Sequence, residues 1–296
     1  MRVGLQIPHF YSAGGTEHIG QWLADVARAA DESGFDSIWL MDHFFQLGGF
    51  DWLSPVEGPM LEGYASLGFL AAATRRARLG LLVTGVVYRD PGLLVKTVTT
   101  IDVLSGGRAA FGIGAAWYEE EARGLGLPFP PLRERYERME ETLEIAKRMW
   151  AGDERPYQGR HYRLDRPLNS PPAISRPHPP ILIGGSGPRR TLRLVAQHAD
   201  ACNLSGTYYE PVETIAGQLA VLREHCEAVG RRYDEIERTV LDTFDVSNDA
   251  GVDDAVRRCE ALAGVSIQTV LVNIPHAFGV EDVQRLARVV TAVADF

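Results

Sequence analysis

Residues 78–114 read RLGLLVTGVVYRDPGLLVKTVTTIDVLSGGRAAFGIG and hold one complete strand–helix–strand unit. Residues 78–88 are apolar and uncharged after Arg78, which predicts a strand buried on both faces. Pro91 opens a helix through about residue 104, and Gly106–Gly107 ends it. Residues 109–114 predict the next strand. Because strands joined by a crossover helix run parallel, this unit predicts a parallel sheet.

The same alternation extends from this unit to both ends of the chain. Eight strand–helix pairs in strict succession predict one α/β domain that spans residues 1–296, a single (β/α)8 TIM barrel. A doubly wound open sheet alternates in the same way and is the less favoured alternative. A proline-rich insertion at about 153–180 precedes strand 5. The strands are expected at 3–8, 35–41, 78–88, 109–114, 180–184, 200–205, 237–246 and 267–274, and the helices at 17–33, 63–74, 91–104, 132–150, 187–198, 211–229, 252–263 and 280–294.

The composition excludes several classes of protein. With 296 residues, 45% of them hydrophobic, the chain can bury a large core, which excludes disorder. The formal net charge of −9 argues against nucleic acid as the main partner. A run of 18 apolar residues and a signal peptide are both missing, so no membrane partner is expected. The three cysteines fit neither a disulfide framework nor a zinc site, which favours a reducing cytoplasm.

In a barrel of this type the chemistry lies where the strands end. Asp42 and His43 directly follow the second strand. A carboxylate beside an imidazole at this position indicates an acid/base pair, a metal pair or a cofactor contact. A metal enzyme would use these two residues with His9 and His276, but the sequence contains no strong metal-binding spacing, so no metal site is predicted.

A glycine-rich stretch at 184–187 follows the fifth strand and precedes a helix. Small residues there allow backbone amides to approach an anion, so this loop is predicted to bind a phosphate. Arg189 and Arg190 are expected in the first helical turn, where an anion would offset their unfavourable interaction with the helix dipole. The spacing of Gly112 and Gly114 resembles part of a dinucleotide fingerprint, but the third glycine is absent and Trp117 occupies its space.

Five segments carry a resemblance to a known family. The chain resembles the luciferase-like monooxygenase and hydride-transferase superfamily, and within it the branch that uses the 8-hydroxy-5-deazaflavin coenzyme F-420. The match runs essentially the whole chain. The segments are GFDSIWLMDHF at 34–44, LVTGVVYRDPGLLVKTVTTIDVLSGGR at 82–108, FGIGAAWYEEEARGLGLPFPPLRERYERMEETLEI at 111–145, PPILIGGSG at 179–187 and HADACN at 198–203.

The resemblance implies roles for individual residues. Asp42 and His43 would lie beside the deazaflavin, with His43 near the reacting carbon. A non-prolyl cis peptide is implied at Gly85–Val86 behind the ring, and the insertion is implied to cover the substrate. The sugar-phosphate dehydrogenases of this branch carry a catalytic glutamate where this chain has Trp117, and this departure argues against the sugar-phosphate reaction. The cofactor contacts are implied at Asp42, Thr84, Gly85, Val86, Gly114, Ala115, Ala116, Trp117, Glu120, Gly184, Gly185 and Ser186.

The sequence therefore predicts an oxidoreductase that transfers a hydride between the deazaflavin cofactor, coenzyme F-420, and a small organic substrate. A deazaflavin transfers hydride without readily activating oxygen, so the protein need only orient the reactants and manage one proton. The alternatives are an FMN-dependent monooxygenase with a separate flavin reductase and a non-catalytic flavin-binding barrel. A homodimer is implied by the resemblance alone, and the substrate is not specified by any motif.

Overall fold

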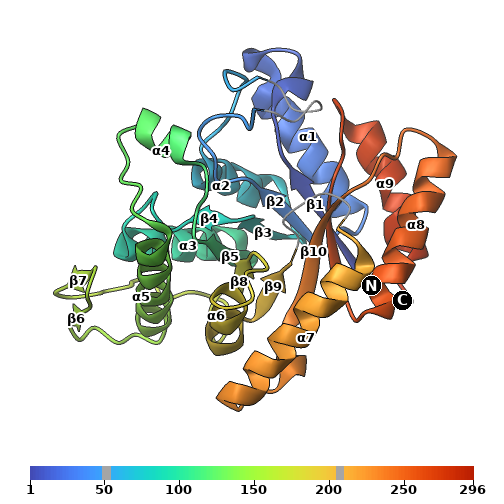
Figure 1. Cartoon of the computed structure of the whole chain (residues 1–296). Helices are drawn as coiled ribbons and strands as arrows, with labels where there is room; N and C mark the ends of the chain where they lie inside the picture. The colour runs from blue at the N-terminus through green and yellow to red at the C-terminus, as the bar shows by residue number, and fades with distance from the viewer. Residues whose placement is uncertain (49–54, 205–209) are drawn as a thin grey trace.

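The computed structural model describes residues 1–48, 55–204 and 210–296. Eight parallel strands close into a ring in which each strand pairs with its neighbour along the chain and the last pairs with the first (Figure 1). The predicted TIM barrel is therefore confirmed, and the open sheet is wrong. The strands of the ring are β1 (Arg2–Ile7), β2 (Ser37–Leu40), β3 (Arg78–Leu81), β5 (Ala109–Gly114), β8 (Ile181–Gly184), β9 (Ala201–Asn203), β10 (Glu237–Thr243) and β11 (Thr269–Asn273).

Helices surround the ring on its outer side (Figure 1). One of them, α4 (Glu119–Gly124), is short and was not predicted; it lies between β5 and the next long helix. Three single turns of 3-10 helix, at Tyr11–Ala13, Thr16–His18 and Tyr233–Glu235, complete the described helical segments. The long helices are α1 (Ile19–Glu32), α2 (Gly63–Ala73), α3 (Pro91–Ser105), α5 (Leu132–Trp150), α6 (Thr191–His198), α7 (Val212–Val229), α8 (Asp249–Gly264) and α9 (Val280–Ala292).

The third strand is interrupted. After β3 the chain resumes as a two-residue strand, β4 (Thr84–Gly85), which also pairs with β5. Gly80 pairs with Ala110 and Thr84 with Ile113, so four steps on one side match three on the other. This extra residue is a β-bulge, and it places Leu82 and Val83 at the carboxyl-terminal end of the barrel.

The interior of the barrel is filled around the indole of Trp39 in β2. A Cβ on Gly80 would lie 2.5 Å from the Trp39 ring, so glycine is required for this ring to fit. The Trp39 Nε1–H donates to Ser37 Oγ at 2.9 Å, so the buried ring has its polar partner. Trp39 packs in one cluster with Ala110, Leu182, Ala201 and Leu271.

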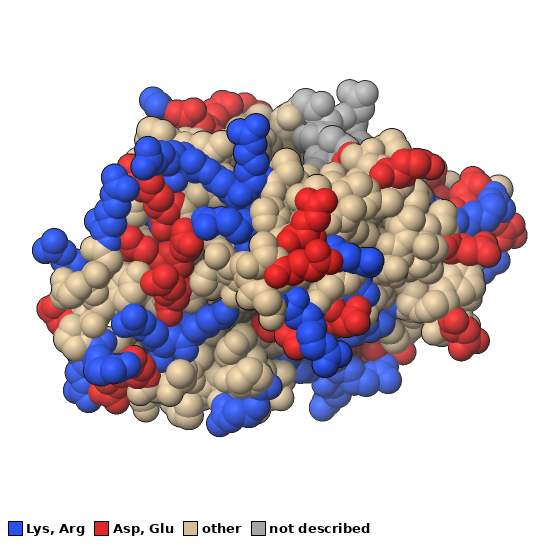
Figure 2. Space-filling model, turned by 60° about the horizontal axis from the view of Figure 1, so that its bottom comes forward, with Lys and Arg blue, Asp and Glu red and all other residues tan. Residues whose placement is uncertain are grey.

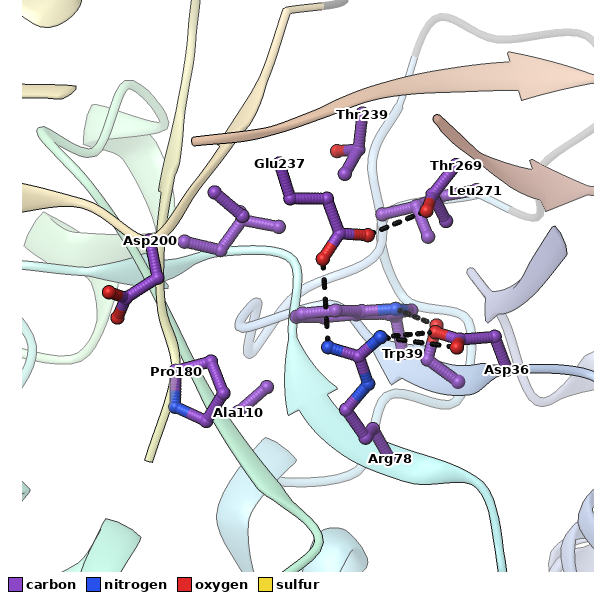
Figure 3. Close-up of a pocket in the computed structure, with 13 residues that line it drawn as sticks. Asp36, Trp39, Arg78, Ala110, Pro180, Asp200, Glu237, Thr239, Thr269 and Leu271 are labelled. Atoms are coloured by element: carbon purple, nitrogen blue, oxygen red, sulfur yellow. Dashed lines mark hydrogen bonds and ion pairs between the residues drawn. The ribbon is translucent and has the colours of Figure 1, made fainter. Parts of the chain in front are cut away.

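Arg78 closes the amino-terminal end of the barrel, as Figure 3 shows. Its guanidinium lies 2.8 Å from Asp36 and 3.7 Å from Glu237, and Glu237 also accepts from Arg2 and Thr269. The cavity beside them measures about 40 Å³, which is room for water but not for a cofactor. A ligand of any size must therefore enter from the opposite end.

The insertion forms a small hairpin, β6 (Tyr157–Gln158) with β7 (Arg163–Leu164), that lies beside α5 in Figure 1. Glu141 on α5 accepts the backbone amides of residues 160–162, and Asp102 on α3 accepts those of 174 and 175. The insertion thus lies mainly on the outer face of α3 and α5. Tyr162 reaches the connection after β4, where it lines a cavity of about 170 Å³ with residues 86–90.

Charges of both signs are interspersed on the face seen in Figure 2. Blue Lys and Arg side chains lie next to red Asp and Glu side chains, so this face presents no single-sign patch of the kind that grips a nucleic acid backbone. In the described part of the chain, no helix has the length and apolarity needed to cross a membrane.

Gly112 is expected to be essential for the bulge. A Cβ at this position would lie 2.0 Å from the Leu81 carbonyl oxygen, a backbone atom that cannot rotate away. Gly112→Ala should therefore lower the free energy of unfolding by about 3 kcal/mol or more, measured by urea denaturation. As a control, Gly217→Ala in α7 meets nothing within 4 Å and should raise stability by about 0.5–1 kcal/mol. Equal stability of Gly112→Ala and the unmodified protein would contradict this explanation.

Candidate active site

Asp42 and His43 are adjacent in the sequence but contact different partners. The Asp42 carboxylate is buried and accepts both guanidinium nitrogens of Arg89, at 2.8 and 2.9 Å, and the amide of Gly85 at 3.1 Å. Burial raises the pKa of Asp42, and the Arg89 guanidinium opposes that effect. Since both oxygens of Asp42 are occupied in this way, Asp42 and His43 do not form the pair that the sequence suggested.

Glu121 is the carboxylate that contacts His43. His43 Nδ1 lies 2.6 Å from Glu121 Oε1, and the His43 side chain is 14% exposed whereas Glu121 is fully buried. The Glu121 carboxylate also accepts from the Tyr88 hydroxyl at 2.5 Å and from the amides of Phe44 and Phe45 at 2.7 and 3.2 Å. Burial alone would raise the pKa of Glu121, but the hydrogen bond and charge of His43, together with the other donors, hold it below its usual value.

Two aromatic rings flank the other side of His43. Trp117 lies edge-on to the imidazole at 5.5 Å between ring centroids, and Tyr118 at 5.9 Å. The two rings stack on each other at 5.2 Å, although Trp117 remains 62% exposed. Such an exposed aromatic pair beside an imidazole provides a surface for an apolar or aromatic part of a ligand.

The non-prolyl cis peptide lies at Leu82–Val83, so the expectation of a cis bond at Gly85–Val86 is wrong. Gly85 is instead in regular strand pairing with Gly114, and a Cβ on Gly85 would meet the Tyr88 ring at 2.5 Å. The glycine at 85 therefore makes room for Tyr88.

Val83 lies over glycines of two neighbouring strands. A Cβ on Gly114 would lie 2.7 Å from Val83, and a Cβ on Gly184 would lie 2.9 Å from it. The bulge, Gly114 and Gly184 together give the carboxyl-terminal end of the barrel a surface of backbone and one branched side chain. A flat ring fits such a surface because no bulky side chain projects from the glycines.

The other predicted contact residues after β4 and β5 have mixed surroundings. Thr84 is buried, and its hydroxyl lies 2.7 Å from the Tyr64 hydroxyl on α2, while Val86 is buried with its amide bonded to Gly114. Ala115 and Ala116 are partly exposed, and Glu120 is exposed on α4. Gly114 is buried, so the backbone of Ala115 and Ala116 is the partly exposed part of this loop.

Arg135 on α5 holds the loop that follows β5. Its guanidinium donates to the Ala116 carbonyl at 2.6 Å and lies 4.1 Å from the centroid of the Phe129 ring. Ala116 has a φ of +59°, a left-handed conformation that residues other than glycine seldom adopt. The sequence did not indicate this buried arginine, because Arg135 lies among several other charged residues of an amphipathic helix.

The glycine-rich loop after β8 has the openness that phosphate binding requires. Residues 184–187 are partly exposed, and Gly185 has a φ of +112°, which favours glycine. Helix α6 starts only at Thr191, so Arg189 and Arg190 lie in the turn before it and not in its first turn as expected. Both are exposed, and neither makes an ion pair with any residue in the described ranges.

Two further strand-end residues, Asn203 and Asn273, are accounted for by internal contacts, whereas the buried Nε2 of His9 has no hydrogen-bond partner among the described residues. Asn273 donates to Gln6 at 2.8 Å, and Asn203 donates to Thr239 at 3.0 Å, so both amides belong to networks inside the barrel. His9 is fully buried beside Tyr11, and burial lowers its pKa to about 4. Among the described residues, no three His, Cys, Asp or Glu side chains are grouped so that they could hold a metal ion.

Comparison with known proteins identifies a family. The family model described as luciferase-like monooxygenase matches residues 1–278. The chain is 31% identical over 238 residues to an F420-dependent glucose-6-phosphate dehydrogenase of Nakamurella multipartita. The matched region covers 78% of this chain and 66% of the relative, so the chain spans just under two thirds of the relative's length.

Solved structures share the fold across nearly the whole chain. An F420-dependent secondary alcohol dehydrogenase in complex with an F420-acetone adduct has a TM-score of 0.81 at 16% identity and covers 99% of both chains. A monooxygenase from Streptomyces bottropensis has a TM-score of 0.78 at 20% identity, over 98% of this chain and 97% of that one.

Proposed function

We propose, because the chain belongs to the luciferase-like monooxygenase family, that it is an oxidoreductase using coenzyme F420 to move a hydride to or from a small organic substrate. The observation that carries this proposal is His43, held by Glu121 at the carboxyl-terminal end of a barrel whose other end is closed. The relatives named as F420-dependent enzymes support the choice of cofactor.

The residues at the barrel end fit a flat ring that carries a phosphate-bearing tail. The bulge at Val83 and the glycines at 114 and 184 offer a surface for the ring. The partly exposed loop after β8 offers the amides of Ser186 and Gly187 for the phosphate, while the Gly185 amide donates to the Asn203 carbonyl. Arg189 and Arg190 add positive charge beside that loop. When bound, coenzyme F420 supplies a ring carbon that accepts or gives a hydride.

The protein's own chemical task is then the movement of one proton. When a hydride leaves an alcohol carbon, the hydroxyl proton must pass to a base, and in the reverse direction an acid must supply it. His43 is a partly exposed titratable group at this end of the barrel, and its Nε2 has no partner among the described residues. His43 Nε2 therefore takes up or releases the proton.

The aromatic pair beside His43 bears on the substrate. Trp117 and Tyr118 stack where a substrate would approach the imidazole, and this surface favours an apolar or aromatic group over a sugar phosphate. Glucose 6-phosphate, the substrate named for the relatives, is therefore not the substrate that we propose here.

Titration of the purified protein with each cofactor tests the proposal. F420 fluorescence should be quenched with a Kd of about micromolar, and reduced F420 should be oxidised when a panel of small ketones and aldehydes is added. Tight binding of FMN with consumption of oxygen would instead support the FMN-dependent monooxygenase, and binding without turnover would support a flavin-binding barrel.

Gly185→Val is expected to weaken cofactor binding by about tenfold or more, because a branched side chain would stand where the backbone meets the phosphate. Equilibrium fluorescence titration measures the Kd. Gly152→Val is the matched control: Gly152 also has a positive φ, +74°, but follows α5 at the other end of the barrel. If both variants bind the cofactor equally well, this loop does not hold the phosphate.

A homodimer is part of the proposal. Helices α2 and α3 expose Phe69, Leu93 and Leu104, and their apolar surface is suited to a second copy of the chain. Light scattering should give twice the 32.6 kDa of one chain, and Leu104→Glu should shift the mass towards the monomer. We also place the enzyme in a reducing cytoplasm, in keeping with three buried free cysteines.

A further inference from the structure

Glu121 is an unusual carboxylate for its position. It is fully buried and accepts four hydrogen bonds, and among the described residues no Lys or Arg forms an ion pair with it. A buried carboxylate without a cationic partner is costly unless hydrogen bonds and a nearby charge compensate for it. Among the side chains that the structure describes, His43 is the one in contact with Glu121 that can carry a positive charge.

We infer that Glu121 is the positioning residue for His43, because it fixes the ring and keeps a proton on Nδ1 so that Nε2 is the atom that exchanges a proton with substrate. This inference rests on the proposed function and deepens it. The sequence pointed instead to Asp42, whose oxygens the structure assigns to Arg89 and Gly85.

The geometry determines which atom carries the proton. At 2.6 Å, His43 Nδ1 and Glu121 Oε1 must share one proton, since two lone pairs at that distance would repel each other. The Tyr88 hydroxyl and the amides of Phe44 and Phe45 all donate to the same carboxylate and favour its charged form. The proton therefore belongs to Nδ1, and a neutral ring presents the lone pair of Nε2.

A purely structural role for Glu121 makes a different prediction. In that case the carboxylate would only anchor the amides of Phe44 and Phe45, and glutamine would replace it with little effect. In Glu121→Gln, however, the side-chain oxygen can keep those amides while its NH₂ donates to His43 Nδ1. The single proton of a neutral imidazole then moves to Nε2, which reverses the tautomer without removing the anchor.

Nitrogen NMR of the imidazoles tests the tautomer in the absence of any cofactor. The His43 signals are assigned by their loss in His43→Gln. The spectra are followed as the pH is raised until the ring is neutral. In the neutral ring of the unmodified protein we expect a protonated Nδ1 and an unprotonated Nε2, and in that of Glu121→Gln we expect the reverse. An unprotonated Nδ1 in the unmodified protein would overturn the inference even if Glu121→Gln failed to fold.

Steady-state kinetics with F420 test the consequence. Glu121→Gln should lower kcat by about 10²–10⁴-fold with a much smaller change in KM, because the misplaced proton affects the reaction more than binding. The matched control is Glu119→Gln, an exposed glutamate on the same helix, α4, whose side chain pairs with Arg123; this variant should leave kcat unchanged. A kcat for Glu121→Gln within about twofold of the control would overturn the positioning role.

These outcomes separate the inference from the proposed function. Failure of the protein to bind F420 would reject the cofactor while the NMR result on the His43 tautomer stood. Normal F420 turnover with an unaltered tautomer in Glu121→Gln would reject only the role of Glu121.

Discussion

His43→Ala is expected to lower turnover with F420 by about 10²–10⁴-fold, the usual contribution of a general acid or base. The imidazole is partly exposed at the open end of the barrel, and Glu121 holds it in one orientation. Cofactor affinity should change much less, because the expected contacts to the phosphate lie in the loop at 184–187, which follows a different strand. Stopped-flow measurement of F420 oxidation or reduction at saturating cofactor gives the rate directly.

His18→Ala serves as the control for this variant. The His18 side chain is 65% exposed and lies in a 3-10 turn, so its loss should leave turnover unchanged. Normal turnover of His43→Ala with saturating cofactor would remove His43 from the mechanism. A Kd for F420 that rose as steeply as kcat fell would instead make His43 a cofactor ligand.

Hydrophobic and glycine patterns were sufficient to predict the barrel. Every long helix and seven of the eight ring strands begin and end within about four residues of their expected places, because apolar runs and flanking Gly or Pro residues mark these elements locally. The exception is the strand expected at 78–88, of which β3 covers only Arg78–Leu81. The β3–β4 interruption was not predicted, since LLVTG reads as a continuous strand. Its cause is long-range: the bulge depends on the close approach of the Leu81 carbonyl to Gly112 in the next strand.

The candidate site was predicted only where its residues follow strands directly. His43 could be inferred from its place after β2, but its partner Glu121 lies 78 residues away on the short helix α4. The run Glu119–Glu121 reads as a solvated charge cluster. A signal was present in the apolar spacing of Ala122 and Leu125 after Glu121, yet one turn of helix gives too few residues for periodicity to decide which glutamate is buried.

The ion pair between Arg89 and Asp42 could not be predicted from the sequence either. The sequence places Asp42 beside His43, and adjacency suggests a pair, but strand ends bring Arg89 from the next connection against Asp42. The guanidinium also contacts Glu62, the residue that precedes α2, and lies 4.7 Å from the Tyr64 ring centroid. Two connections, the one between β2 and α2 and the one between β4 and α3, are thus joined at one cation, and this depends on barrel closure rather than on local spacing.

Arg89→Met is therefore expected to destabilise the protein by about 3–5 kcal/mol, the cost of leaving one member of a buried ion pair alone. Asp42 is fully buried and Arg89 is 12% exposed, so water cannot replace the lost partner. Without Arg89, burial leaves the pKa of Asp42 raised with less opposition. Between the ordinary carboxyl pKa of about 3.9 and that raised value, the folded state binds a proton that the unfolded state has released. The deficit should consequently be smallest near pH 4 and grow as the pH rises.

Urea denaturation at several pH values measures this effect, and two comparisons define it. The double variant Asp42→Asn with Arg89→Met should recover part of the stability, because an amide carries no buried charge. Arg257→Met breaks an exposed pair with Asp254, in which both side chains are more than 60% exposed, and should cost less than about 1 kcal/mol. If Arg89→Met lost no more stability than Arg257→Met, Arg89 would not be the element that joins these connections.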